Sequence, residues 1–240
     1  MQIIYEPRGR AAEYGPLAAN LYRGCSHACE YCYAPAATRR ARTDFVQPSP
    51  RNVMKQFEKD VIEMEKADDQ RPVFLCFTCD PYQPLDYEQK LTRRAIQILC
   101  GHGRNLTILT KGGMLSVRDF DILKQYPDQV LYGATLVFAD DAEARCIEPG
   151  ASPTSERIAA LNIAHDLGIK TWVSFEPVYH VEDVHTMIDQ TKDFVDLFKV
   201  GKLNYVKTDI DWTEFAQDVK AHLEQTGVEY YLKDDLRKLL

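Results

Sequence analysis

Cys25, Cys29 and Cys32 lie close together near the start of the chain, with three residues in the first gap and two in the second. Three thiolates in one short loop can hold three corners of an iron–sulfur cluster and leave the fourth iron open for chemistry. Zinc is the alternative, with His27 as a fourth ligand, but His27 lies between the first two thiols and no second pair of ligands follows nearby. The spacing therefore favours a [4Fe–4S] cluster with three protein ligands.

The bulk composition is that of an ordinary globular protein. The chain has 240 residues, of which 45% are hydrophobic and 27% charged, and this length suits one large domain or one α/β barrel. The net charge of −7 does not indicate nucleic-acid binding, so any such site would need a local basic patch.

Cysteine usage and the first residues bear on the compartment. Seven cysteines without a secretion signal argue against a disulfide framework, and residues 1–10 carry charges but no apolar core. No apolar run is long enough to span a membrane, so we expect a cytoplasmic protein. Cys76 and Cys79 form a second close pair, whereas Cys100 and Cys146 stand alone and are typical of buried small hydrophobes.

From residue 72 onward, apolar strands alternate with helical segments, which indicates a parallel sheet covered by helices. About six such units fit a partial (β/α)6 barrel of the TIM type, and no Gly-x-Gly-x-x-Gly follows any strand. We expect a single domain over 1–240, with an irregular leader over 1–16 and a C-terminal extension over 200–240 that packs on the barrel. The expected strands are 17–22, 73–77, 105–110, 130–138, 170–175, 194–200 and 229–232; the expected helices are 52–66, 87–100, 116–125, 153–167, 181–191, 213–225 and 234–240.

In barrels of parallel strands, the working residues lie at the carboxyl ends of the strands. Here those ends carry polar or soft groups directly after apolar runs, which is where a site would be assembled. They are the cysteine loop, Thr78-Cys79-Asp80, Thr110-Lys111, Thr135, Glu176 and residues 199–204.

The pattern Cys-x-x-x-Cys-x-aromatic-Cys resembles that of the radical S-adenosylmethionine (radical SAM) superfamily. The resemblance implies that S-adenosylmethionine (AdoMet) chelates the open iron through its amino and carboxylate groups. An electron from the cluster then cleaves the sulfonium to a 5′-deoxyadenosyl radical, which takes a hydrogen atom from the substrate. It also implies an electron donor of the flavodoxin or ferredoxin type, while the oligomeric state is left open.

Further stretches resemble the spore photoproduct lyase-like branch of that superfamily, over about 20–179: residues 20–25, 32–34, 78–84, 148–151 and 156–160. The resemblance implies that Cys25, Cys29 and Cys32 ligate the cluster and that Tyr31 contacts the adenine. It also implies the AdoMet contacts of three strand ends: Thr78 and Cys79 on the amino group, Lys111 on the carboxylate, and Thr135. The alternative for Lys111 is a solvated surface lysine, and for Thr135 an ordinary strand residue.

Three further positions are candidates near the cofactor. Arg145 and Glu148 are expected to interact there or to fix the loop before the helix at residue 153, with a purely structural salt bridge as the alternative. Glu176 ends a strand and is expected to face the AdoMet ribose or the substrate, although the neighbouring Pro177 also fits a structural turn.

One position departs from spore photoproduct lyase, which repairs a thymine dimer in DNA with a cysteine as hydrogen-atom donor. Phe77 occupies the donor position here, and phenylalanine cannot take that role. In a regular strand Cys76 would point away from Phe77. Cys79 lies on the following turn and could supply a thiyl radical or contact the cofactor.

Three hypotheses follow. The first is a radical SAM enzyme that acts on a nucleoside or on a base of a nucleic acid such as DNA. The second is the same radical chemistry on a small molecule, peptide or protein. The third is a non-catalytic metal-binding module. A locally basic region and nearby aromatic rings would serve the first, or form a solvated face and ordinary packing. These residues are Arg23, Arg39, Arg40, Arg42 and Lys55, with Tyr22, Tyr31, Tyr33 and Tyr82.

Overall fold

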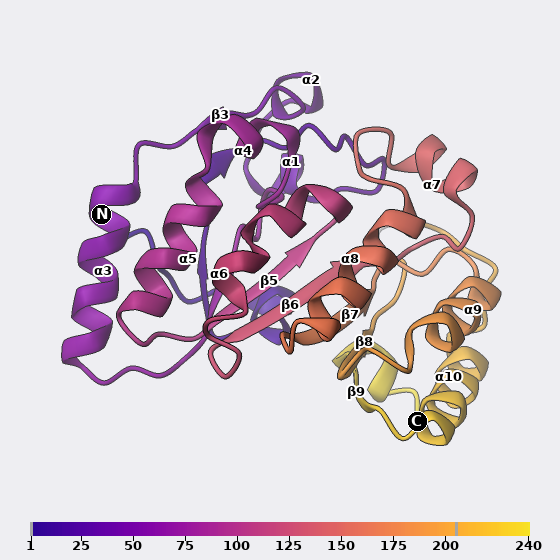
Figure 1. The fold of residues 1–240 in the computed structure, drawn as a ribbon. Helices are drawn as coiled ribbons and strands as arrows, with labels where there is room; N and C mark the ends of the chain where they lie inside the picture. The colour runs from indigo at the N-terminus through magenta and orange to yellow at the C-terminus, as the bar shows by residue number, and fades with distance from the viewer. Residues whose placement is uncertain (1, 205) are drawn as a thin grey trace.

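The computed structural model describes residues 2–204 and 206–240, and one parallel sheet organises them (Figure 1). Its seven strands follow one another in the order β1-β4-β5-β6-β7-β8-β9, and every neighbouring pair is parallel. This arrangement confirms the predicted α/β partial barrel. The strands are β1 (Leu17–Ala19), β4 (Val73–Leu75), β5 (Leu106–Thr110), β6 (Val130–Thr135), β7 (Lys170–Phe175), β8 (Leu197–Val200) and β9 (Glu229–Leu232).

Helices follow the strands and cover the outer face of the sheet (Figure 1). None of the described helices is long and apolar enough to cross a membrane. The helices are α1 (Ala34–Ala37), α2 (Arg42–Phe45), α3 (Met54–Lys66), α4 (Pro84–Gln89), α5 (Leu91–Gly101), α6 (Phe120–Leu123), α7 (Asp141–Ile147), α8 (Thr154–Asp166), α9 (Val181–Thr191), α10 (Trp212–Thr226) and α11 (Asp234–Arg237). Two 3-10 helices are η1 (Gly9–Glu13) and η2 (Gly113–Asp119). Strands β2 (Tyr22–Arg23) and β3 (Ser49–Pro50) form a separate antiparallel pair.

The structure departs from the predicted elements where single residues leave regular geometry. The helix expected over 87–100 is two helices, because Lys90 between them is left-handed, with φ 52° and ψ 32°. The strand expected over 73–77 ends at Leu75, because Cys76 has a φ of 64°. The segment expected as a helix over 116–125 begins as η2, and the short helix α7 was not predicted.

The last part of the chain belongs to the sheet more closely than predicted. Strand β9, which the sequence predicted over 229–232, pairs in parallel with β8 from Leu197–Glu229 to Val200–Leu232 and is the seventh strand of the sheet. Helix α10 packs against α9, β9 and α11. Residues 200–240 therefore extend the barrel itself and do not merely lie on it.

The leader crosses the open side of the incomplete barrel and is held at both ends. Near its start, Asp60 on α3 accepts the backbone N–H groups of Ile3 and Ile4 at 2.5 and 3.0 Å. Near its end, Glu13 accepts the backbone N–H of Asp234 at 3.0 Å. Between these points, Tyr5 and Ala18 exchange two backbone hydrogen bonds along the free edge of β1. The leader thus connects the first edge of the sheet to the last.

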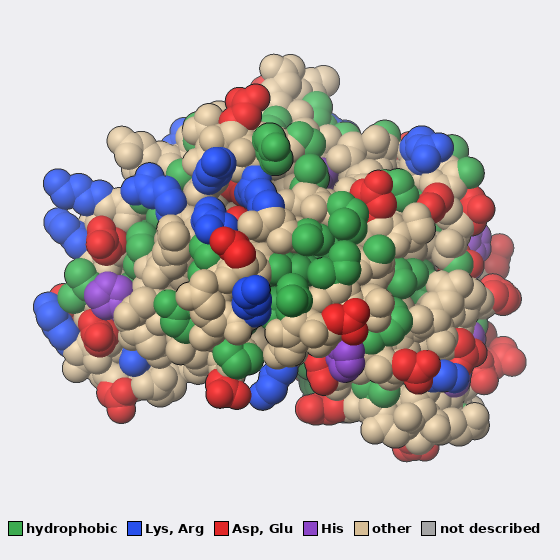
Figure 2. All heavy atoms as spheres, viewed as in Figure 1, with side chains coloured by type: hydrophobic (Ala, Val, Ile, Leu, Met, Phe, Trp, Pro, Cys, Tyr) green, Lys and Arg blue, Asp and Glu red, His purple; other side chains and the backbone are tan. Residues whose placement is uncertain are grey.

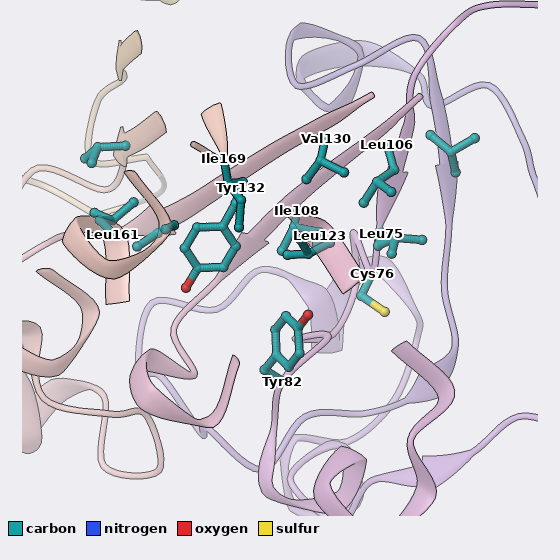
Figure 3. Close-up of a cluster of buried hydrophobic side chains, with 14 of the residues drawn as sticks. Leu75, Cys76, Tyr82, Leu106, Ile108, Leu123, Val130, Tyr132, Leu161 and Ile169 are labelled. Carbon is teal, nitrogen blue, oxygen red and sulfur yellow. The ribbon is translucent and has the colours of Figure 1, made fainter. Parts of the chain in front are cut away.

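The main core lies between the sheet and the outer helices. Leu75, Ile108 and Tyr132 come from three neighbouring strands and are fully buried, and Leu123 packs above them (Figure 3). Full burial of each such side chain stabilises the fold by roughly 1.5–3 kcal/mol. The hydroxyl of Tyr132 lies 2.7 Å from the hydroxyl of Ser116, so the one polar atom of this group has a partner.

On the inner face of the sheet, one glycine permits a large ring to cross. Gly133 on β6 lies opposite Trp172 on β7, and the indole N–H donates to the carbonyl of Ile108 on β5 at 2.9 Å. A Cβ at position 133 would lie 2.3 Å from the indole nitrogen. The ring therefore fits across β6 only because residue 133 has no side chain.

Gly133→Ala should lower the free energy of unfolding by about 1–3 kcal/mol, because the added methyl group overpacks this site. Gly101→Ala is the matched control: a Cβ there meets nothing within 4 Å, so it should be neutral or stabilising within about 1 kcal/mol. Urea unfolding followed by circular dichroism measures both. Equal transition midpoints for the two variants would contradict the close approach.

Candidate functional site

A cavity of about 430 Å³ opens at the carboxyl ends of the strands. It is lined by nine of the eleven residues that the sequence pointed to as ligands or as candidates near the cofactor. They come from the cysteine loop and from four strand ends: Cys25, Cys29, Cys32, Tyr31, Thr78, Cys79, Lys111, Thr135 and Glu176. The other two do not line it: Arg145 is exposed on α7, and Glu148 is buried.

Neighbouring segments hold the cysteine loop through its backbone. The N–H of Cys25 donates to the carbonyl of Phe45 at 2.9 Å, and the Arg42 guanidinium donates to the carbonyl of Cys29 at 2.7 Å. On the other side, Gly150 donates its N–H to the carbonyl of His27 at 2.9 Å. A Cβ on Gly150 would lie 2.1 Å from the carbonyl oxygen of Ser26, so the loop and residue 150 touch directly.

The three thiols have the state and surroundings that a metal cluster needs. All three are free, and burial raises the pKa of the Cys29 thiol to about 12 and that of Cys25 well above its usual range. Without metal the Cys25 and Cys29 thiols keep their protons, and iron binding must release them. The buried His27 Nε2 and the Ser26 hydroxyl have no hydrogen-bond partner among the described residues. These unpaired polar atoms beside three thiols fit a cluster whose sulfur atoms accept hydrogen bonds.

A buried carboxylate, Asp80, connects three parts of the cavity wall. Its oxygens accept the Thr110 hydroxyl at 2.6 Å and the backbone N–H of Lys111 at 2.7 Å, both from the end of β5. It also accepts the N–H of Tyr82 at 2.8 Å within its own turn. His27 Nδ1 lies 3.5 Å from the same carboxylate, and burial lowers the pKa of this imidazole. The sequence placed Asp80 at a strand end without assigning it this role.

A second polar group lies under Tyr31. The Tyr31 hydroxyl donates to Glu148, which also pairs with Arg157 at 2.5 Å and lies 4.0 Å from Lys111 Nζ. Burial raises the pKa of Tyr31 well above its usual range, so the phenol stays protonated. The predicted partner of Glu148 was wrong: the guanidinium comes from Arg157 on α8, which faces inward, and not from Arg145.

Glu176 is the centre of a third group, which sequence reasoning largely missed. Its carboxylate accepts the Tyr14 hydroxyl at 2.5 Å and the Lys233 ammonium, and Asn204 donates to its other oxygen at 3.2 Å. The Lys233 ammonium also lies 3.5 Å from the centre of the Tyr14 ring. The partners come from the leader, the loop after β8 and the end of β9, so no local sequence pattern predicts that they meet at Glu176.

The turn after β4 differs from a continued strand. Although the strand ends before Cys76, the Cys76 side chain lies in the main core between the sheet and the helices, whereas Phe77 packs with Phe74 and Trp172 on the inner face, so the two side chains point to opposite faces as expected. Thr78 donates its backbone N–H to the side chain of Asn20 at 2.7 Å, which fixes the turn beside the cysteine loop. Cys79 is partly exposed in the cavity.

The basic residues of the cavity are not those that the sequence suggested. Among the described residues, none of the five that the sequence grouped as basic lines it; Arg42 supports the cysteine loop, and Arg40 donates to the carbonyl of Asp44 at 2.9 Å. Its basic lining is Arg8, Arg10, Lys111, Lys202 and Lys233. Elsewhere the surface is mixed, and in the view of Figure 2 acidic side chains gather over α9 and α10.

Arg157→Met should lower the free energy of unfolding by about 3–5 kcal/mol, because it leaves the Glu148 carboxylate buried without its ion-pair partner. Arg145→Met removes an exposed guanidinium from a nearby helix and should change stability by no more than about 0.5 kcal/mol. Chemical denaturation of the metal-free protein compares the two. A larger loss for Arg145→Met would contradict the assignment of the pair.

Known proteins share this fold. A mutant of spore photoproduct lyase superposes with a TM-score of 0.73 at 14% identity, covering 95% of this chain and 80% of that one. Streptococcus suis SuiB bound to S-adenosylmethionine superposes with a TM-score of 0.69 at 13% identity, over 90% of this chain and 49% of SuiB. The chain thus spans about half of SuiB, and at these identities the likeness concerns the fold alone.

Two relatives in sequence are described as uncharacterised proteins. The chain is 27% identical over 213 residues to protein MJ0683 of Methanocaldococcus jannaschii, covering 88% of this chain and 76% of that protein. It is 28% identical over 189 residues to protein ORF301 of Acidianus two-tailed virus, covering 74% of this chain and 61% of that protein. It therefore spans less than two thirds of the viral relative.

The family is established by the sequence pattern of the domain itself. The radical SAM superfamily model matches residues 19–195, which include the cysteine loop and strands β4, β5, β6 and β7 of the sheet. Members of this superfamily use a [4Fe–4S] cluster and S-adenosylmethionine, and the cavity has the thiols and polar groups that such cofactors need. The chain therefore belongs to the radical SAM superfamily and is a radical S-adenosylmethionine enzyme.

Proposed function

We propose that this single domain uses Cys25, Cys29 and Cys32 to hold the [4Fe–4S] cluster and acts on a nucleic-acid base or nucleoside. When bound, the cluster and AdoMet supply a 5′-deoxyadenosyl radical that takes hydrogen from the substrate. A flavodoxin- or ferredoxin-type protein is the proposed electron donor. The observation that carries the proposal is that the three thiols and the strand-end contacts line one cavity.

The residues around the thiols have separate tasks in this proposal. Lys111 binds the AdoMet carboxylate, and its backbone is fixed by Asp80 while its ammonium lies 5.5 Å from the centre of the Tyr31 ring. Tyr31 contacts the adenine and is held through Glu148. Thr78, Cys79 and Thr135 complete the AdoMet contacts. Arg145 is not retained, because it is exposed outside the cavity.

The polar groups at the far strand ends are assigned to the substrate side. Glu176 is already satisfied by Lys233 and Tyr14, so we assign it to holding that wall of the cavity rather than to the AdoMet ribose. Cys79 is the more exposed of the two cavity thiols outside the cluster set and is the proposed hydrogen-atom donor to a substrate radical. Phe77, which is close to Cys79 in the same turn, cannot donate a hydrogen atom in this way.

Two solved structures bear on the substrate. Spore photoproduct lyase has been crystallised with a dinucleoside spore photoproduct, and SuiB with a precursor peptide. The basic and aromatic lining of the present cavity supports the first kind of substrate for this chain. A peptide, protein or small molecule is the alternative substrate. The hypothesis of a non-catalytic metal-binding module is dropped, because the chain belongs to an enzyme family.

Cys25→Ala should abolish the cluster, because two remaining thiolates do not hold three corners of it. After anaerobic reconstitution, the variant should lack the charge-transfer absorption near ~400 nm and form no 5′-deoxyadenosine with dithionite. Cys146→Ala is the control, since this exposed thiol lies outside the cavity; it should retain both. Reductive cleavage by Cys25→Ala would refute the ligand assignment.

Lys111→Ala should weaken AdoMet binding about tenfold or more, the value of one charge-assisted hydrogen bond. Equilibrium dialysis of AdoMet against reconstituted protein measures the dissociation constant. Lys124→Ala, an exposed lysine outside the cavity, is the matched control and should bind like the unaltered protein. Equal affinities for the two variants would remove Lys111 from the site.

A further inference from the structure

The size of the cavity limits how the substrate can enter. About 430 Å³ lies near the lower end of the range for pockets that enclose one drug-sized ligand. If AdoMet occupies it, as the proposed function requires, little enclosed space remains for a second molecule. The substrate must then insert only its reacting group, and the rest of it must lie on the residues at the mouth.

The charge of the cavity lining is opposite to that of the whole protein. Five basic side chains line it against two carboxylates, whereas the chain as a whole has a net charge of −7. Both carboxylates already have partners: Asp80 accepts from Thr110 and Glu176 pairs with Lys233. A basic cleft on an acidic molecule attracts an anionic ligand to that place in particular, since clefts focus the local field.

Two of the basic side chains remain available for a ligand. Arg8 is exposed and has no ion pair within the part of the chain that the structure describes, and Lys202 contacts only the face of Trp212, at 5.0 Å from the ring centre. The other three are engaged: Arg10 with Asp235 at 3.1 Å, Lys111 near Glu148, and Lys233 with Glu176. Arg8 and Lys202 come from the leader and from the loop after β8, so they meet the cavity from different segments.

A row of aromatic rings lies in the same cavity. The rings of Tyr33 and Phe77 are 6.2 Å apart, and Tyr14 follows at 5.6 Å from Phe77. Tyr33 is 44% exposed, and its hydroxyl is fixed on the carbonyl of Phe77 at 3.0 Å. Of these rings only Tyr33 is exposed, and Tyr14 and Phe77 are half-buried behind it. An exposed ring in a cavity with basic side chains is the combination that binds single-stranded nucleic acid, because bases stack on rings while cations hold phosphates. An acidic peptide would use the cations but not the rings.

We infer that the leader and the loop after β8 form the binding rim for a single-stranded nucleic acid, with Arg8 and Lys202 on its phosphates and Tyr33 against a base. This inference rests on the proposed function for the position of the reacting group. It assigns a task to residues 1–16, which the sequence indicated only as an irregular leader. The leader can hold Arg8 in place because it is fixed on Asp60 at one end and on Asp234 at the other.

The test measures binding of a fluorescein-labelled oligothymidylate of about eight nucleotides, within the site sizes of single-strand binders. Fluorescence anisotropy on the reconstituted enzyme with AdoMet, at low salt, should give saturable binding. Arg8→Glu and Lys202→Glu should each weaken it about tenfold or more and reduce the slope of log affinity against log salt by about 0.7 per lost contact. Tyr33→Ala should weaken binding without changing that slope.

Arg94→Glu is the matched control, because this exposed arginine lies on outer helix α5, outside the cavity; it should bind like the unaltered protein. Thermal unfolding of each variant, and the milder Arg8→Ala, separate lost binding from lost folding. The inference is overturned if the oligonucleotide does not bind, if Arg8→Glu binds like Arg94→Glu, or if a polyglutamate peptide competes equally well. Reductive AdoMet cleavage by the unaltered enzyme tests the proposed function separately: if cleavage occurs without oligonucleotide binding, only the rim is wrong.

Discussion

The cavity depends on one buried carboxylate. Asp80 accepts hydrogen bonds from its own turn and from the end of β5, and lies beside His27 of the cysteine loop. A buried carboxylate is costly unless donors surround it, so the three segments must approach closely enough to supply them. The same approach brings the cysteine loop, the Thr78 turn and Lys111 to a common space. The geometry of the site is therefore a consequence of satisfying one charge.

The second buried charge extends this constraint to the far side of the loop. Glu148 needs Arg157, and this pair fixes both the Tyr31 hydroxyl and, through the Arg157 guanidinium at 3.0 Å, the carbonyl of Thr135 at the end of β6. A buried ion pair adds little net stability but is severely destabilising when one partner is lost. The wall under Tyr31 therefore does not tolerate the loss of either partner alone.

The sequence predicted the ends of β5, β7, β8 and β9, because apolar strands followed by polar residues are a local pattern, whereas β1, β4 and β6 end two or three residues earlier than expected. Strands β7 and β9 and helix α9 have the predicted bounds, and the predicted candidates other than Arg145 and Glu148 line the cavity. The missed features depend on partners far along the chain, such as Tyr14 and Lys233 on Glu176. Arg145 and Arg157 are both near Glu148 in sequence, and only the direction in which their helices face decides between them.

The incomplete barrel explains why distant segments meet at Glu176. A sheet that does not close leaves β1 and β9 as free edges, and an uncovered edge exposes unpaired backbone groups. The leader covers the edge of β1 through Tyr5 and Ala18 and reaches the β9 side through Glu13 and Asp234. In spanning this gap it inserts Tyr14 between Phe74 and Trp172 and brings Arg8 to the cavity. The segment that completes the fold is therefore the one that shapes the entrance to the cavity.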